Sequence, residues 1–361
     1  MGCGASRRAP APGGRTHTDF ARFGDHIYRG ELKRGKPDGA GVYTWASGDD
    51  WVRFQRYTTY EGEFRKFQRH GYGEYRSADG ASYVGEWVRG RREGLGVACD
   101  TDGTRYDGYF LADRRHGCGV LIRQLGYEYA GEWQSDERHG RGVETQTEGR
   151  HEGEYQGGRM HGRGLHVWFA TGNRYEGEWR AGAIHGSGTF TWPDRKYEGE
   201  WEDGEQHGYG VFTSVHGDRF EGEYRSGKRH GRGSYTGADG SYKYDGEWFQ
   251  GVENGRGQSE DGEGTFEGHF FQGKRHGHGV ATAAGSLQRY EGGWQVGKRH
   301  GRGIETTAQG TFEGEFCLGK RHGSGVEQWA DGRSFRGEYQ ANSVPRICLL
   351  APERARILQN F

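Results

Sequence analysis

The residues best suited to chemistry stand at the N-terminus, which reads MGCGAS. This order matches the N-myristoylation pattern M-G-x-x-x-[ST], in which Gly2 is acylated after removal of the methionine. Cys3 follows directly and is a candidate for S-palmitoylation. One myristoyl chain binds a bilayer only marginally, whereas two acyl chains hold stably. The motif therefore predicts a lipid anchor on the cytosolic face of a membrane.

A second candidate chemistry comes from ten histidines that each precede a glycine at regular intervals. They are His70, His116, His139, His161, His185, His207, His230, His276, His300 and His322. Equivalent positions on successive β-hairpins lie about 9.6 Å apart, whereas two imidazoles on one zinc ion need nitrogens within about 2.1 Å of it. We therefore expect histidines that shape turns and hydrogen-bond to the backbone, with no metal and no other cofactor.

Pairs of basic residues precede several of these histidines. The pairs are Lys228-Arg229, Lys274-Arg275, Lys298-Arg299 and Lys320-Arg321, joined by Arg91-Arg92 and Arg114-Arg115. Placed in hairpin loops about 10 Å apart, close to a Debye length, they would form a basic edge that contacts anionic lipids. A solvated edge neutralised by nearby glutamates is the alternative, which the formal net charge of −1 favours.

Composition narrows the class of protein. The chain has 361 residues, of which 71 are glycine, and its 50 Lys and Arg nearly balance its 51 Asp and Glu. This balance argues against nucleic-acid binding, which favours an excess of basic residues. No run of about 18 apolar residues is present, and the five cysteines contain no C-x-x-C pair, which favours a reducing compartment. No catalytic constellation stands apart from the repeat described next, so we expect no enzyme.

An internal repeat, aromatic-x-Gly-x-aromatic, must position the histidines and the basic pairs. Its fourteen copies open at Tyr28, Tyr60, Tyr83, Tyr106, Tyr129, His151, Tyr175, Tyr197, Phe220, Tyr244, Phe266, Tyr290, Phe312 and Phe335. From the second copy onward the spacing is 22, 23 or 24 residues, and the first interval is 32. Such regular spacing predicts a quasi-one-dimensional array of one structural unit.

The copy that begins at Phe220 shows why the unit is expected to be a β-hairpin. Phe220, Gly222 and Tyr224 alternate with glutamates, so they point to one face of a strand, and Gly231, Gly233 and Tyr235 repeat the alternation. The residues 227–230 between the two runs, and 239–240 after them, have turn composition. An aromatic ring from a neighbouring strand would cover each glycine. Glu223 and Arg232 are expected to oppose one another on the other face.

These segments resemble the MORN family (membrane occupation and recognition nexus). Residues 197–210 and 220–233 follow the family consensus Tyr-x-Gly-x-Trp-x-x-Gly-Lys-x-His-Gly-x-Gly nearly letter for letter. The resemblance implies a long single-layer sheet of hairpins and a role in scaffolding or tethering at membranes or cytoskeletal structures, with phosphoinositide binding as a further implication. The chain is most similar to repeat-only MORN scaffolds of protists, which are cytoskeletal and dimerise end to end.

The sequence thus predicts an all-β, elongated single-layer antiparallel sheet of about 14 stacked β-hairpins, followed by a short C-terminal helix. Residues 1–27 form a flexible acylated leader, residues 28–342 the array and residues 343–361 a cap or partner segment. We expect a non-enzymatic scaffold that links the cytoplasmic face of a membrane, plasma or flagellar, to protein partners or the cytoskeleton. A self-associating cytoskeletal protein and a regulatory subunit of a lipid kinase in trans are the alternatives. Among partners, a second copy of the chain could form a homodimer through the C-terminal end.

Overall fold

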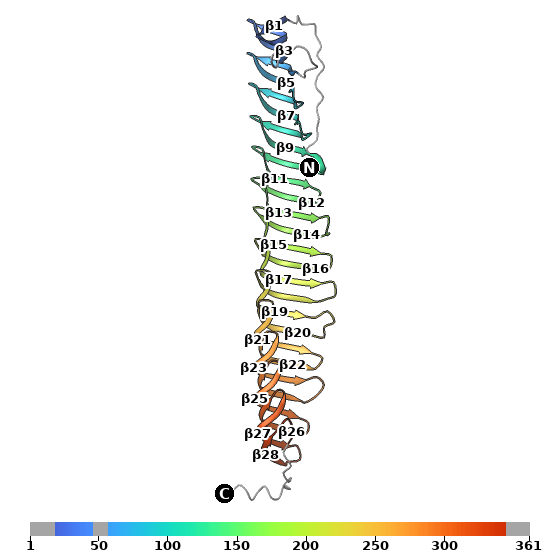
Figure 1. Cartoon of the computed structure of the whole chain (residues 1–361), viewed down its shortest axis with the longest axis vertical. Helices are drawn as coiled ribbons and strands as arrows, with labels where there is room; N and C mark the ends of the chain where they lie inside the picture. The colour runs from blue at the N-terminus through green and yellow to red at the C-terminus, as the bar shows by residue number, and fades with distance from the viewer. Residues whose placement is uncertain (1–18, 46–56, 344–361) are drawn as a thin grey trace. The chain divides into compact units, whose positions relative to one another are not determined.

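The computed structural model describes residues 19–45 and 57–343, which form 28 β-strands and one short 3-10 turn. The chain divides into two compact units, Met1–Ala183 and Ile184–Phe361. In each unit the strands follow one another in chain order, as Figure 1 shows. The predicted all-β class is confirmed.

The first unit holds the 3-10 turn Gln124–Gly126 and fourteen strands. They are β1 (Asp19–Phe23), β2 (His26–Lys33), β3 (Lys36–Trp45), β4 (Thr58–Arg65), β5 (Gln68–Arg76), β6 (Ser82–Val88), β7 (Arg91–Cys99), β8 (Arg105–Leu111), β9 (Arg114–Ile122), β10 (Glu128–Gln134), β11 (Glu137–Thr145), β12 (Gly149–Gln156), β13 (Arg159–Trp168) and β14 (Arg174–Arg180).

The second unit holds the remaining strands, the first of which begins at the boundary. They are β15 (Ala183–Trp192), β16 (Arg195–Glu202), β17 (Glu205–Ser214), β18 (Arg219–Arg225), β19 (Lys228–Thr236), β20 (Lys243–Phe249), β21 (Val252–Asp261), β22 (Gly264–Phe271), β23 (Lys274–Ala283), β24 (Arg289–Gln295), β25 (Lys298–Thr307), β26 (Gly310–Cys317), β27 (Lys320–Trp329) and β28 (Ser334–Tyr339).

The first thirteen predicted hairpins are present, but the first turn of each is tighter than expected. In the hairpin β18–β19, Arg225 pairs with Lys228, so only Ser226 and Gly227 form the loop. Their φ angles are 49° and 72°, which suit the two-residue turns that match the twist of antiparallel strands. The prediction of a turn over 227–230 is therefore wrong beyond Gly227, and the basic pair and its histidine belong to β19.

A bulge follows this turn and changes the expected pairing on the outer face. Gly222 pairs with Gly233, and the register then shifts before Tyr224. Gly231 does not continue the alternation, because it adopts a φ of 58°. The carboxylate of Glu223 instead accepts a hydrogen bond from the Arg232 backbone N–H at 3.1 Å, so no side-chain ion pair forms between the two residues.

The second turn of the unit lies where the composition placed it. Gly240 donates its backbone N–H to the Gly237 carbonyl at 2.9 Å, and Ser241 donates to the Asp239 carboxylate at 2.9 Å. This is the geometry of an Asx-stabilised turn. It connects β19 to β20 and so joins one hairpin to the next.

The ends of the array differ from the prediction. Strand β1 lies inside the predicted leader and pairs with β2, so the sheet begins nine residues before the first repeat at Tyr28. The fourteenth copy, at Phe335, contributes one strand, β28, rather than a complete hairpin. The predicted C-terminal helix falls outside the described residues.

Candidate binding surface

The aromatic residues of each repeat form one continuous ladder along a face of the sheet in each unit. Tyr60 is fully buried. Its ring meets Phe64 of its own strand edge-on, with centroids 5.0 Å apart, and meets Trp87 of the next hairpin at 5.4 Å. Each such contact contributes about 0.5–1.5 kcal/mol beyond the area that it buries. The rings at the first and fifth positions of the repeats are therefore the core of the fold, and most of their surface is buried.

Paired glycines make room for the first ring of each repeat. Gly62 and Gly73 face one another on adjacent strands beneath the Tyr60 ring, and any side chain on either glycine would collide with it. The Tyr60 hydroxyl donates a hydrogen bond to the Glu63 carbonyl at 3.1 Å. The expectation that the glycine and aromatic columns depend on one another is thus confirmed.

A column of arginines covers the outer side of these rings. Its members are Arg69, Arg92, Arg115, Arg138, Arg229, Arg275, Arg299 and Arg321. The guanidinium of Arg115, for example, lies 4.3 Å from the centre of the Trp133 ring and donates to the Asp136 carbonyl of the next turn at 3.0 Å. Each arginine thus adds a cation–π contact, and several also bond directly to the neighbouring hairpin.

The predicted basic edge is consequently split between two environments. Lys228, Lys274, Lys298 and Lys320 are exposed, whereas Arg229, Arg275, Arg299 and Arg321 are partly buried on the aromatic face. The placement of these pairs in hairpin loops is wrong, because each pair begins a strand. Lipid contact by the four lysines stays a prediction.

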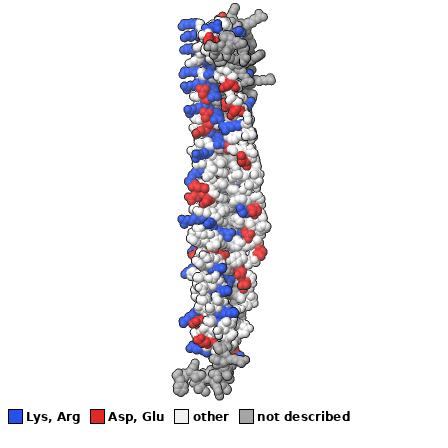
Figure 2. Space-filling view, in the orientation of Figure 1, with Lys and Arg blue, Asp and Glu red and all other residues white. Residues whose placement is uncertain are grey.

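The strongest row of exposed cations lies instead at the hairpin turns of the first unit. Figure 2 shows Lys and Arg side chains stacked along a margin of this unit. The exposed cations in and beside its first turns are Lys33, Arg34, Lys36, Arg65, Lys66, Arg89, Arg91, Arg114, Arg159 and Arg180. Arg91 and Arg114 belong to basic pairs that the sequence already indicated. The other cations do not stand out as pairs after the turn, because they precede it, lie in it or follow it singly.

The histidines that precede glycine lie in strands, not in turns. His70, for example, belongs to β5 and pairs across the hairpin with Glu63. His207 lies 3.1 Å from the Glu202 carboxylate. Within residues 19–45 and 57–343, no three His, Cys, Asp or Glu side chains are close enough to hold a metal ion.

His151 is the one histidine that replaces a first-position ring of the ladder. It is 1 % exposed, packs edge-on against Tyr155 and Trp179, and neither ring nitrogen has a hydrogen-bond partner. Burial, with a smaller effect from neighbouring His166, lowers the pKa of His151 from 6.5 to about 4. The ladder therefore contains a polar ring at a position where tyrosine elsewhere donates to a carbonyl.

We expect His151→Tyr to stabilise the protein by about 1–3 kcal/mol, because it removes two unsatisfied nitrogens and supplies a hydroxyl. The lowered pKa means that unfolded chains take up a proton first as the pH falls. Wild-type stability should therefore decline from about pH 6.5 down to about pH 4, and the variant should lack this part of the decline. Urea denaturation at several pH values measures both effects. The control His322→Tyr, at an exposed strand position, should show the wild-type pH dependence, and identical profiles for the two variants would refute the prediction.

The lipidation residues Gly2 and Cys3 lie outside the described residues, so their modification stays a prediction. The part of the chain that the structure describes contains no helix long and apolar enough to cross a bilayer.

Comparison with known families agrees with the repeat geometry. The MORN repeat model matches thirteen segments, which open at the first thirteen predicted positions. They are residues 28–50, 60–82, 83–105, 106–124, 129–149, 151–169, 175–195, 197–219, 220–242, 244–265, 266–285, 290–311 and 312–332. No curated protein matches the chain. Because the matched segments cover most of the sequence and coincide with the observed hairpins, the chain belongs to the MORN repeat family.

Proposed function

We propose that this protein is a non-enzymatic scaffold, tethered to the cytoplasmic face of a membrane by acyl groups on Gly2 and Cys3, that holds protein partners or the cytoskeleton near that surface. A MORN repeat array is typical of a scaffold or binding role. Within the described residues the repeated side chains pack one hairpin on the next. This arrangement fits a structural scaffold better than a catalytic site.

The observation that carries the membrane part of the proposal is the row of exposed cations at the turns of the first unit. This unit follows the acylation motif directly in the chain. A basic patch beside an acyl chain supplies the second signal that stable membrane anchoring needs. Each cation near an anionic surface contributes about 1 kcal/mol.

Gly2→Ala should move the protein from the membrane fraction to the soluble or cytoskeletal fraction, because it removes the myristoyl acceptor. Fractionation of cells that express each form, followed by immunoblotting, measures the shift. Detergent extraction of the wild type separates the alternatives: it should solubilise a membrane-tethered scaffold and leave a self-associating cytoskeletal protein in the pellet. Unchanged fractionation of the variant would exclude the acyl anchor.

The basic turns are testable apart from the acyl chains, with bacterially produced, unacylated full-length protein. Combined replacement of Lys33, Lys36 and Arg65 by glutamine should weaken binding to phosphatidylserine-containing vesicles at least tenfold. The matched control replaces Lys274, Lys298 and Lys320 by glutamine, which removes the same charge from the second unit. Vesicle sedimentation at low and high salt gives the affinities. Equal losses in both triple variants would contradict a special role for the first unit.

A further inference from the structure

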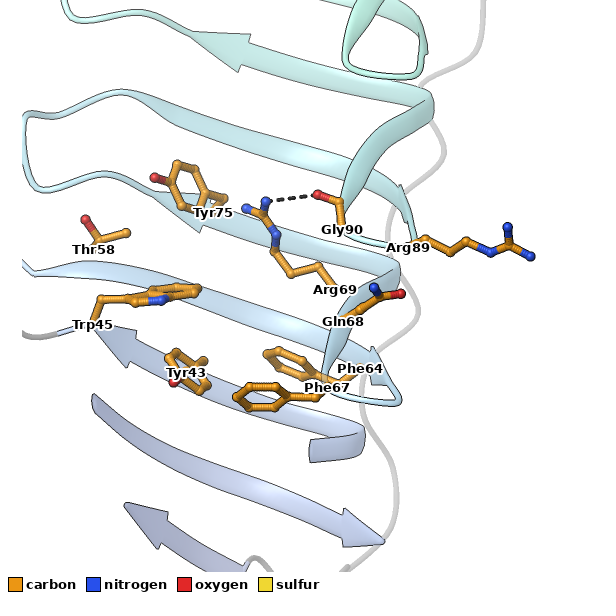
Figure 3. A pocket seen from close by; sticks show the side chains of 10 residues that line it. All are labelled: Tyr43, Trp45, Thr58, Phe64, Phe67, Gln68, Arg69, Tyr75, Arg89 and Gly90. Atoms are coloured by element: carbon orange, nitrogen blue, oxygen red, sulfur yellow. Dashed lines mark hydrogen bonds between the residues drawn. The ribbon is translucent and has the colours of Figure 1, made fainter. Parts of the chain in front are cut away.

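A groove of about 610 Å3 opens on the aromatic face of the first unit, between β3, β4 and β5 and the turn after β6. Its main lining side chains are Tyr43, Trp45, Phe64, Phe67, Arg69 and Tyr75, which Figure 3 shows. Tyr43 and Trp45 lie with ring centroids 4.5 Å apart, and Tyr75 lies 6.5 Å from Trp45. Trp45 and Tyr75 are only partly buried, so the groove presents apolar rings to a ligand.

Arg69 brings an unpaired charge into this apolar groove. Its guanidinium lies 3.9 Å from the centre of the Trp87 ring and donates one hydrogen bond, to the Gly90 carbonyl at 2.9 Å (Figure 3). Arg92, the next member of the arginine column, lies 3.5 Å from the Asp113 carboxylate, and Arg115 lies 3.1 Å from that of Asp136. Among the described residues no carboxylate comes within ion-pairing distance of Arg69.

Because Arg69 is partly buried, the lack of a carboxylate partner among the described residues is costly. Burial lowers the pKa of Arg69 from its usual value, and the nearby Tyr75, Tyr60 and Asp113 offset this only in part. The guanidinium has five N–H groups, and the described residues accept a hydrogen bond from one of them. A carboxylate would restore the pairing that its neighbours in the column already have.

Phe67 is a second departure from the repeat at the same place. It occupies the second position of its turn with a φ of 66°. Ten other hairpins have glycine at this position: Gly35, Gly90, Gly158, Gly182, Gly204, Gly227, Gly251, Gly273, Gly297 and Gly319. A left-handed conformation is costly for a bulky residue. The ring is 43 % exposed and lies beside Phe23 and Tyr43, at 5.1 and 5.8 Å. The strained backbone conformation of Phe67 thus places an aromatic ring in the groove.

We propose that this groove docks a peptide segment of a partner protein in which an aromatic or aliphatic side chain stands next to an aspartate or glutamate. The apolar side chain packs among Trp45, Phe67 and Tyr75, and the carboxylate pairs with Arg69. This inference rests on the scaffold role proposed above and names the chemical class of one partner. Charge complementarity selects an acidic segment, and the rings select an apolar neighbour for it.

Selection of a random 12-residue peptide library on the immobilised full-length protein tests the inference. We expect enrichment of sequences with Asp or Glu beside Trp, Phe, Tyr, Leu or Ile. An enriched peptide is then synthesised with a fluorophore, together with its Glu→Gln or Asp→Asn counterpart, and fluorescence anisotropy gives both affinities. The amide counterpart should bind at least tenfold more weakly.

Two variants and a matched control locate the binding. Arg69→Gln should weaken binding of the acidic peptide at least tenfold and leave that of the amide peptide nearly unchanged. Arg92→Gln removes the same kind of cation from the neighbouring repeat, outside the groove, and should change the affinity less than twofold. Phe67→Gly should weaken binding at least fivefold while the melting temperature stays about the same, because glycine relieves the turn that the ring strains.

The inference is overturned if the selection enriches no acidic peptide, or if the Arg69 and Arg92 variants lose affinity equally. Binding of phosphatidylserine vesicles that depends on Arg69, without peptide binding, would also overturn it and assign the groove to a lipid headgroup. Proximity labelling around the full-length protein separates this inference from the scaffold role. If the protein labels partner proteins but binds no acidic peptide, the groove site is refuted and the scaffold role stands. If the wild-type protein labels no partner protein at all, the scaffold role itself is refuted.

Discussion

Gly222→Ala is expected to destabilise the second unit by more than about 3 kcal/mol. A Cβ atom on Gly222 would lie 2.5 Å from the Arg232 carbonyl oxygen and still closer to the Cα of Gly233. Both atoms belong to the backbone of the paired strand, so neither can rotate away. The strands β18 and β19 would have to separate at the point where the Phe220 ring packs over them.

The control for this variant is the same substitution at Gly262, a turn residue with open space around it. Gly262→Ala should be neutral or slightly stabilising, because alanine reduces the conformational freedom of the unfolded chain. Urea denaturation followed by circular dichroism compares the two variants. Similar midpoints for both would show that the glycine pairs are not required by packing.

Glu305→Gln is expected to cost about 3 kcal/mol, because it breaks a buried network of charges. Glu305 is 6 % exposed and lies 2.5 Å from Arg299 Nη1 and 2.9 Å from Arg321 Nη2. Removing the carboxylate leaves two partly buried guanidinium groups on neighbouring hairpins with less compensation. The exposed Glu313 supplies the control, since its replacement by glutamine should change stability by less than about 0.5 kcal/mol.

The effect of Glu305→Gln should depend on pH. Burial alone would raise the pKa of Glu305, but hydrogen bonds and charges from Arg299 and Arg321 outweigh burial and hold the pKa below its usual value of 4.5. A lowered pKa stabilises the folded state above the unfolded value, and this contribution disappears as the pH falls through the folded value. The difference between wild type and variant in urea midpoint should therefore be full at pH 7 and shrink below about pH 4.5. A difference that stays constant down to pH 3 would contradict this assignment.

Much of the fold can be predicted from the sequence, because the spacing of the repeats and the residue pattern within each repeat determine it. The repeat starts, the pairing of glycines with rings and the turn at Asp239 all follow from period-two alternation and turn composition. The first turn does not, because Lys228, Arg229 and His230 are as polar as a loop, although they belong to a strand.

The polarity of these residues also makes the arginine column hard to predict from the sequence. Arg229 pairs with Tyr224 across the hairpin and so lies on the aromatic face, and this pairing requires both the two-residue turn and the bulge. That Arg69 has no carboxylate partner among the described residues is different in kind. It depends on which side chains of neighbouring hairpins come within about 4 Å, and no periodicity specifies that distance. Phe67, in contrast, is visible in the sequence as a departure from glycine at a fixed repeat position.

The sharing of each ring between two hairpins has a consequence for local stability. Phe312 meets Phe316 on its own strand at 5.3 Å and Tyr339 on β28 at 4.8 Å, whereas Phe335 meets only Tyr339 in the described ladder. Within the described ladder, the last strand of the second unit therefore makes a ring contact with one other hairpin, whereas the interior strand β26 makes ring contacts with two. Local opening should begin at β28 and spread one hairpin at a time. The rate of amide hydrogen exchange in this unit should consequently fall stepwise from Tyr339 toward the interior, so that distance from the end sets the lifetime of each hairpin.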